Sequence, residues 1–277
     1  MTESTEHPLG RQHLAGCVAL SQAANWNQNE ADWRLMLEIG RGWGVSLADG
    51  TLVASTLVLP YGSDFAWVSM VLVLPEHRRM GYATHLLRVA LKDLENRGLT
   101  PVLDATPAGR EVYQHEGFQD RWGFSRIATK SISPAPADGS VRALRDSDWT
   151  WILELDALAF GASRERVLRD LARRLPQAAL VSEGQGFLLG REGREARQVG
   201  PLVARDEQTA KKLLSHALRA VEPPTYLDVV AHAPALREWL EARGFLFQRP
   251  FTRMVRGAAP APGNEKLVFL VAGPELG

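Results

Sequence analysis

The chain repeats one sequence pattern near the end of each of its halves. The first copy reads VLDATPAGREVYQHEGFQDRWGFSR and the second reads YLDVVAHAPALREWLEARGFLFQRPFTR. Each copy has a short strand-like run with Leu-Asp, a helix-like run, and a Gly-Phe that is followed after five residues by Phe-x-Arg. The shared glycines are natural helix stops, and the Phe-x-Arg runs are typical of strands. Agreement at several points in one order predicts a duplicated fold.

The segment SISPAPADGS at residues 131–140 divides the chain nearly in half. It is rich in Pro, Ala and Ser and has no apolar periodicity, which is typical of a linker. A chain of 277 residues is long enough for a domain on each side of it. We therefore predict a catalytic domain at residues 1–133, a linker at 134–140 and a degenerate second domain at 141–277, for reasons given below.

Composition excludes several classes of protein. Lys plus Arg and Asp plus Glu number 32 each, so the net charge gives no reason to expect a nucleic-acid partner. The single Cys17 allows neither a disulfide framework nor a cysteine zinc site, and the histidines show no metal-ligand spacing. The N-terminal segment is polar, and no apolar run is long enough to span a membrane. We expect a cytoplasmic protein without metal or membrane partner, and the oligomeric state stays open.

The first half has a mixed α/β order with a strand–helix–strand crossover. Helices are predicted near residues 13–24 and 30–38, then at 83–97 and 108–116. Strands are predicted for the hairpin WGVSLADGTLVASTLVL, which turns at Asp49-Gly50, and for FAWVSMVLVL, PVLDA and WGFSRIATKSI. The predicted fold class is therefore α/β, with a mixed sheet flanked by helices in each domain.

The stretch PEHRRMGYAT at residues 75–84 joins an apolar strand to an apolar-periodic helix. A helix N-terminus presents unpaired N–H groups and partial positive charge, and glycine allows close approach to the backbone. Gly81 stands at that point, and Arg78 and Arg79 add fixed charge. The pattern indicates a pyrophosphate site. The alternative is a tight strand-to-helix turn with surface arginines.

The order Val-x-Pro-Glu-x-Arg-x-x-Gly-x-Ala in this stretch resembles the acyl-CoA loop of the GNAT N-acetyltransferase superfamily. A second family feature is a tyrosine four residues before a Gly-Phe at the end of the next helix, and Tyr113 stands in that position before Gly117-Phe118. The resemblance covers about residues 10–130 well and the second half as a diverged copy. It implies a tandem GNAT protein that uses acetyl-CoA as co-substrate.

The resemblance also implies which residues hold the coenzyme. In the family, the strand before the loop diverges from its neighbour and pairs with the pantetheine arm, and this role falls on Val71, Leu72 and Val73. The loop residues implied to hold the phosphates are Arg78, Arg79, Met80, Gly81, Tyr82, Ala83 and Thr84. Thr106 occupies a position where the family often has an asparagine that touches the coenzyme.

Acetyl transfer to an amine needs a proton for the leaving thiolate and a neutral amine for the attack. The resemblance implies that Tyr113 is the general acid; the alternative is an ordinary core aromatic. The strand before the loop has no carboxylate, so we predict that Asp104, in the next strand, is the base or an anchor for the amine. Asp228 repeats Asp104 in the second half, so the alternative is that both order the following turn. Glu76 is expected to face solvent.

Acceptor contacts in the family come from the first two helices and their connecting loop, here NWNQNEADW. We predict that Trp26, Asn27 and Asp32 bind the acceptor, and that Trp33 belongs to the core. Aromatic, amide and acidic groups together suit a small amine or an amino-acid-like molecule.

The second half lacks the same features. Its counterpart of the coenzyme loop, LVARDEQTAKKLL, is three residues shorter and has neither the glycine nor the arginine pair. Leu240 stands where the first half has Tyr113. We therefore predict one active half and a second half with a structural or acceptor-shaping role. The alternative readings are a non-catalytic acyl-CoA-binding or sensor protein, and a structural protein that shares only the fold.

Overall fold

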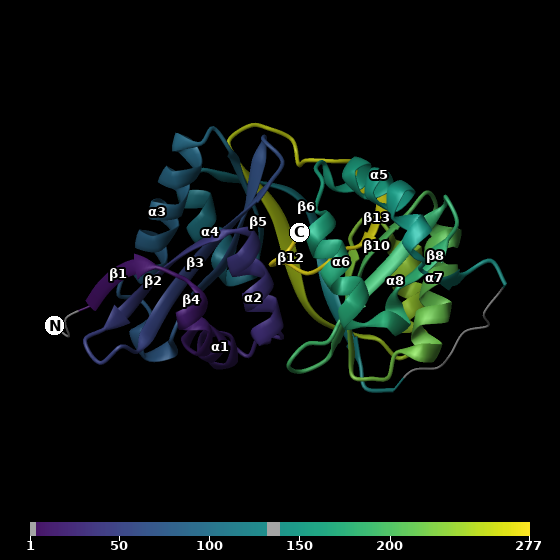
Figure 1. Ribbon diagram of the computed structural model, residues 1–277, viewed down its shortest axis with the longest axis horizontal. Coiled ribbons are helices and arrows are strands. Elements are labelled where there is room, and N and C mark those ends of the chain that lie inside the picture. Colours follow the sequence, from purple (N-terminus) through teal and green to yellow (C-terminus); the bar gives the residue numbers. More distant parts are fainter. Residues whose placement is uncertain (1–3, 132–138) are drawn as a thin grey trace. The chain divides into compact units, whose positions relative to one another are not determined.

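The structure is a computed structural model that describes residues 4–131 and 139–277 (Figure 1). Most of the predicted linker, residues 134–138, lies outside the described residues. The chain forms two compact units, residues 1–103 with Leu276, and residues 104–275 with Gly277. This division falls inside the strand at residues 100–105, well before the predicted linker. The reason is that a different strand, residues 118–129 at the end of the first repeat, pairs with two strands of the second repeat. The repeat boundaries at 1–133 and 141–277 stay a prediction.

The first unit contains an N-terminal sheet with the strand order β1-β2-β3-β4-β5, antiparallel except between β4 and β5. Its elements are β1 (Ser4–Pro8), η1 (Arg11–His13), α1 (Leu14–Ala23), α2 (Glu30–Ile39), β2 (Arg41–Leu47), β3 (Leu52–Tyr61), β4 (Phe65–Val73), η2 (Pro75–His77), α3 (Tyr82–Asn96) and β5 (Thr100–Ala105). The predicted helices and strands of this region are confirmed. The edge strand β1 was not predicted, because its sequence STEHP has no apolar alternation.

Local chemistry accounts for the turn and the layering of this unit. Gly50 has φ +86°, and the Asp49 side chain accepts a hydrogen bond from the Thr51 N–H at 2.9 Å, which closes the predicted β2–β3 hairpin. Leu52 lies against Gly16 of α1, whereas the adjacent Val53 belongs to a core cluster with Leu86 of α3. Successive strand residues point to opposite faces, so α1 and α3 cover opposite faces of β3.

The second unit contains a sheet with the order β12-β6-β11-β13-β10-β9-β8-β7, in which β10 also pairs with β11. Its elements are α4 (Pro107–His115), β6 (Phe118–Thr129), β7 (Arg142–Ala143), η3 (Asp146–Asp148), α5 (Trp149–Phe160), α6 (Glu165–Arg174), η4 (Pro176–Ala178), β8 (Leu180–Ser182), β9 (Gly186–Arg191), β10 (Arg197–Ala204), α7 (Glu207–Ala220), β11 (Thr225–Val230), α8 (Pro234–Glu241), β12 (Leu246–Arg256), η5 (Glu265–Leu267) and β13 (Val268–Leu270). The mixed α/β class predicted from the sequence is confirmed.

The two Phe-x-Arg strands of the repeats, β6 and β12, lie side by side and antiparallel (Figure 1). Phe124 lies opposite Phe251 in the register, and the two rings stack with centroids 5.0 Å apart. Equivalent residues of the two repeats therefore face each other across these two neighbouring strands. β6 begins at Phe118, four residues before the predicted strand, because Gly117 in the left-handed conformation ends α4 there and the chain pairs at once with β12.

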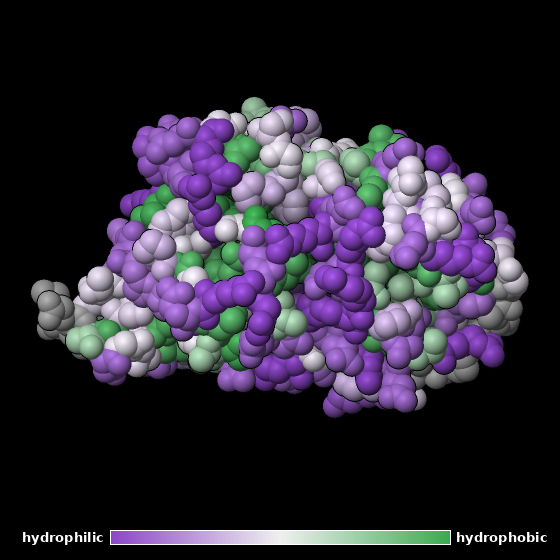
Figure 2. All heavy atoms as spheres, in the orientation of Figure 1, coloured by the Kyte–Doolittle hydropathy of each residue, from purple (hydrophilic) through white to green (hydrophobic). Residues whose placement is uncertain are grey.

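The face of the molecule in Figure 2 is mainly hydrophilic, with small apolar areas between the charged side chains. The single Cys17 is fully buried, and burial raises the pKa of its thiol to about 12. Within residues 4–131 and 139–277, the helices are all too short or too polar to cross a membrane.

Candidate active site

Strand β4 changes its pairing halfway along its length. On one side its register with β3 shifts, so that Met70 and Val71 lie opposite Thr56 alone in a β-bulge, and Met70 has φ +50°. The Ser55 hydroxyl donates to the Met70 carbonyl at 2.8 Å and holds the bulge. On the other side, the parallel pairing with β5 joins only Phe65–Trp67 of β4. Val71–Val73 lie beyond that paired stretch, as the coenzyme role predicted for them requires.

The loop after β4 leads into an open helix N-terminus. Arg79 has φ +61° and Gly81 has φ +87°, so the chain turns sharply into α3 at Tyr82. A Cβ atom at Gly81 would meet no atom of the described residues within 4 Å. The first turn of α3 carries no acidic residue, and none of the side chains that the structure describes caps it. The first N–H groups of a helix have no partner within it, so this end is available to an anion.

The side chains of the loop are exposed rather than packed. Arg78 and Arg79 are exposed, and Met80 is 62% exposed. The Arg78 Nε donates to the Val73 carbonyl at 3.3 Å and so ties the loop to the end of β4. Glu76 is exposed, as expected, which makes it a poor candidate for a base. The residues from Val71 to Thr84 that the sequence predicts to hold the coenzyme thus form one segment, from the end of β4 through the exposed loop to the first turn of α3.

The predicted acceptor residues between α1 and α2 have different surroundings. The Asp32 carboxylate accepts from the Asn29 N–H at 2.8 Å, and the Asn29 side chain accepts from the Asp32 N–H at 3.2 Å. This capping box, with Asp32 fully buried, uses the carboxylate to start α2. Trp33 is buried and donates to Ser21 at 2.8 Å, so it belongs to the core as predicted. Trp26 is half-buried.

Gln28 is a further candidate acceptor contact in the same segment, NWNQNEADW. It is 2% exposed, and its Oε1 has no hydrogen-bond partner among the described residues. Leaving a buried polar atom unsatisfied costs roughly 1–3 kcal/mol, so such an atom favours a ligand or a water. Asn27 beside it is 1% exposed. The sequence signal was the run of amides, which does not say which amide is satisfied internally.

Tyr113 lies in α4, in the second compact unit. Thr106 caps this helix and accepts from the Gly109 N–H at 3.2 Å. The half-buried Tyr113 ring packs over Gly109, where an added Cβ would lie 2.9 Å from it, and meets Phe118 edge-on at 5.8 Å. Burial raises the pKa of Tyr113 to about 12. A phenol is protonated at neutral pH with or without this shift, as a general acid must be.

Asp104 forms a buried ion pair with an arginine of the second repeat. Its two oxygens accept from Nε and Nη2 of Arg253, each at 2.9 Å. The Asp104 side chain is fully buried, and the guanidinium lies 4.1 Å from the centre of the Trp122 ring. Burial raises the pKa of Asp104, and Arg253 acts in the opposite direction. The role of Asp104 as a base stays a prediction, but its contacts support the alternative of an ordering role.

The second repeat has an equivalent pair. Asp228 accepts from Nε and Nη2 of Arg126 at 2.8 and 2.7 Å, and both side chains are buried. The aspartate of each repeat is therefore held by the Phe-x-Arg arginine of the other. The repeated residues are readable in the sequence, whereas the exchange between repeats is not.

The helix that corresponds to α3 in the second repeat is closed at its N-terminus. Asp206 caps α7, and its carboxylate accepts from the Thr209 N–H at 2.7 Å. A negative charge therefore already lies where a pyrophosphate would bind. The counterpart position in α3 is Gly81, which has no side chain.

The strand that corresponds to β4 in the second repeat is also closed along its edge. β10 bulges at Gly200-Pro201, the positions that align with Met70-Val71. Its parallel pairing with β11 covers only Arg197–Val199, and β13 then lies between the two strands. The last strand of the chain thus fills the space between β10 and β11 that corresponds to the open edge of β4.

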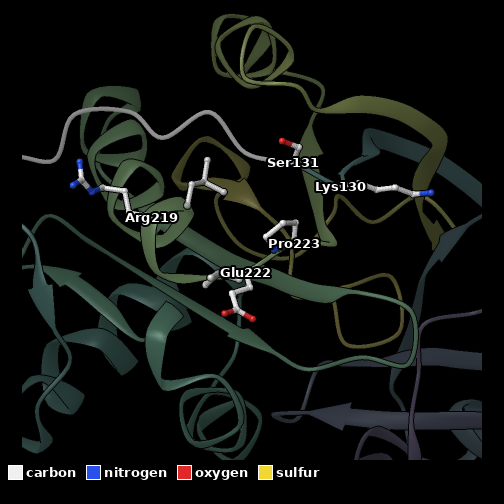
Figure 3. Close-up of a pocket in the computed structure, with 7 residues that line it drawn as sticks. Lys130, Ser131, Arg219, Glu222 and Pro223 are labelled. Carbon is white, nitrogen blue, oxygen red and sulfur yellow. The ribbon is translucent and has the colours of Figure 1, made fainter.

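A pocket of about 500 Å³ lies elsewhere in the second unit, between the end of β6 and the end of α7. Figure 3 shows that the charged ends of Lys130, Arg219 and Glu222 point in different directions around Pro223. Small-molecule sites have polar groups that converge on the ligand, and this pocket does not.

Two family models match the chain. Residues 13–118 match the model described as "Acetyltransferase (GNAT) family", and residues 152–270 match the one described as "Acetyltransferase (GNAT) domain". The first segment contains the first repeat pattern as far as Phe118, and the second segment contains the whole of the second pattern.

Relatives of known name match over nearly the whole chain. An uncharacterised N-acetyltransferase, YitH, of Bacillus subtilis (strain 168) is 22% identical over 246 residues, which are 86% of each chain. The holothin acyltransferase of Pseudoalteromonas sp. (strain SANK 73390) is 25% identical over 264 residues, 92% of this chain and 88% of the relative. A crystal structure of a Pyrococcus horikoshii protein described as an acetyltransferase superposes with a TM-score of 0.84 at 21% identity, over 99% of this chain and 96% of the other. The chain therefore belongs to the GNAT superfamily of acyltransferases and carries two GNAT domains in tandem.

Proposed function

We propose that this acyltransferase uses acetyl-CoA to acetylate a primary amine of a small or amino-acid-like molecule, with its single active site built from the first repeat. The observation that carries the proposal is the open N-terminus of α3, where Gly81 leaves room beside unpaired N–H groups. The uncapped helix end, the exposed arginines and the free edge at Val71–Val73 suit the phosphates and the pantetheine arm of one ligand.

Acetyl-CoA supplies an acetyl group activated as a thioester. In the proposed reaction the amine nitrogen attacks the carbonyl carbon, the carbon–sulfur bond breaks, and the sulfur takes a proton. Tyr113 is the proposed donor of that proton, because a tyrosine phenol is protonated at neutral pH and carries an O–H that it can donate. The proton lost by the amine goes to solvent in this scheme, because both Asp104 oxygens are held by Arg253.

For the acceptor we propose Trp26 and Asn27, as predicted from the sequence, together with Gln28. The unsatisfied Oε1 of Gln28 would accept a hydrogen bond from an N–H of the bound molecule. Asp32 is a weaker candidate, since its carboxylate starts α2. The Pseudoalteromonas relative is named a holothin acyltransferase, which supports acyl transfer as the reaction of this chain.

Release of coenzyme A in the presence of a panel of amines tests the proposal. The panel should include polyamines, amino acids, aminoglycosides and short peptides, with acetyl-CoA alone as the blank. We expect release above the blank for at least one small primary amine, and loss of that release in Tyr113→Phe. Tight binding of acetyl-CoA with no release for any amine would instead support a non-catalytic acyl-CoA-binding protein.

A further inference from the structure

The helix that carries Tyr113 is preceded by Asp104, which the second repeat binds within the same compact unit. Asp104 lies in β5, two residues before Thr106, which caps α4. Its carboxylate is bound at two points by Arg253 of β12. A bidentate arginine–carboxylate pair fixes orientation as well as distance, so the direction in which the chain enters α4 depends on β12.

The other end of the same helix is also held by β12 and the residue after it. The Arg256 Nε donates to the Glu116 carbonyl at 3.1 Å, and the Gly257 N–H donates to the Gly117 carbonyl at 3.0 Å. Both acceptors lie where α4 ends, at carbonyl groups that have no partner within a helix.

The Tyr113 ring has little freedom relative to this helix. It packs over Gly109 within α4 and against Phe118, which is buried and lies opposite Arg256 in the register of β6 and β12. A change in the position of α4 against β12 would therefore move the phenol.

We propose that β12, a strand of the second repeat, positions Tyr113 for acyl transfer, with Arg253 and Arg256 as positioning residues. The proposal rests on the proposed function, in which Tyr113 is the general acid. It gives the second repeat a defined part in the reaction although its own helix end and strand edge are closed.

The exchanged pair of the other repeat provides a matched control. Arg126 holds Asp228 with the same bidentate geometry and the same burial. The helix after Asp228 is α8, which carries Leu240 where α4 carries Tyr113. Arg253→Lys and Arg126→Lys therefore remove the same fork from equivalent pairs and keep the charge, but only the first acts next to the Tyr113 helix. Arg256 is exposed and donates to a backbone carbonyl, so Arg256→Ala leaves no buried charge unpaired.

The first measurement follows Tyr113 directly and needs no acceptor. The chain has four tyrosines, so tyrosine labelled with ¹³C only at Cζ gives four NMR signals, and Tyr113→Phe identifies the signal of Tyr113. We expect Arg253→Lys and Arg256→Ala to move that signal and to bring the pKa of Tyr113 down from about 12 toward the ordinary value of 10.0. Arg126→Lys should leave both unchanged. An unmoved Tyr113 signal in Arg256→Ala, or an equal movement in Arg126→Lys, would overturn the proposal.

The second measurement separates positioning from coenzyme binding. We expect Arg253→Lys and Arg256→Ala to lower kcat about 10- to 100-fold, as a small misplacement of a catalytic group does, with an unchanged Kd for acetyl-CoA. A loss in Kd with kcat preserved would contradict a positioning role. If the Tyr113 signal moves as expected in a protein that releases no coenzyme A with any amine, the proposed function fails while the positioning of the ring by β12 stands.

Discussion

Replacing Gly81 with valine tests whether the loop between β4 and α3 binds the phosphates of the coenzyme. Gly81 has φ +87°, a conformation that L-residues adopt at a cost of roughly 1–2 kcal/mol and β-branched residues adopt rarely. The added side chain would project into space that no described atom occupies. We therefore expect a small loss of stability from strain, and a separate loss of binding because the side chain fills the place of the phosphate.

Gly50→Val separates the two effects. Gly50 has φ +86° and also has nothing within 4 Å of an added Cβ, but it lies in the β2–β3 turn. Backbone strain should be nearly the same in both variants, so their melting temperatures should fall by similar amounts. Only Gly81→Val removes the contact between the helix N-terminus and the ligand.

The size of the binding loss follows from the hydrogen bonds at stake. A hydrogen bond to a charged group contributes about 1.5–3 kcal/mol, so the loss of two N–H contacts to phosphate costs roughly 3–6 kcal/mol. At 1.4 kcal/mol for each factor of ten, acetyl-CoA should bind about 10²- to 10⁴-fold more weakly. Isothermal titration calorimetry of the parent chain and both glycine variants measures this. Equal affinity in Gly81→Val and the parent, or an equal loss in Gly50→Val, would refute the assignment of the loop.

The same contacts predict four further outcomes. Tyr113→Phe should lower turnover roughly 10- to 1000-fold with little change in the Kd for acetyl-CoA, since only the hydroxyl is lost; an unchanged kcat with chemistry rate-limiting would exclude Tyr113. Burial raises the pKa of Tyr113 from 10.0 to about 12, so a pH–rate profile should show no loss of this acid between pH 7 and 10. The contribution of the neutral phenol to folding stability is complete below pH 10 and is lost as pH rises through 12. A chain ending at residue 133 should not fold, because β6 would lose both β11 and β12; a soluble fragment that binds acetyl-CoA and keeps full activity would contradict this. Calorimetry should give one acetyl-CoA per chain, since Asp206 and β13 close the second repeat, and two sites would show that they do not.

Local signals in the sequence predicted most of the helices and strands. The Asp49-Gly50 dipeptide marked a hairpin, and the glycine at position 81 marked the start of α3, because in each case the conformation depends on residues that are adjacent in the chain. The role of Asp32 was also readable, since Asn29 and Asp32 have the spacing of a capping box. The prediction that Asp32 binds the acceptor gave weight to its charge and overlooked that spacing.

The pairing between the repeats was not predictable in the same way. Both Leu-Asp and both Phe-x-Arg motifs are visible in the sequence, but each aspartate could pair with the arginine of its own repeat or with that of the other. The choice depends on strand order, which long-range packing sets and which periodicity does not report. The closing of the β10 edge by β13 has the same origin, because the last strand of the chain pairs with strands that lie far before it in the sequence.

The exchanged ion pairs give a physical reason to expect that the first repeat depends on the second, whose helix end and strand edge are closed. Removing one partner of a buried pair leaves a charge without compensation and costs about 3–5 kcal/mol, a large share of the stability of an ordinary domain. Without the second repeat, Asp104 would lose Arg253 and Arg126 would lose Asp228, and the stacked partner of Phe124 would be lost with them. The residues that close the second site, Asp206 and those of β13, take no part in these contacts. We therefore expect that the second repeat can lose its coenzyme chemistry without losing the contacts of β12 with the residues on either side of α4.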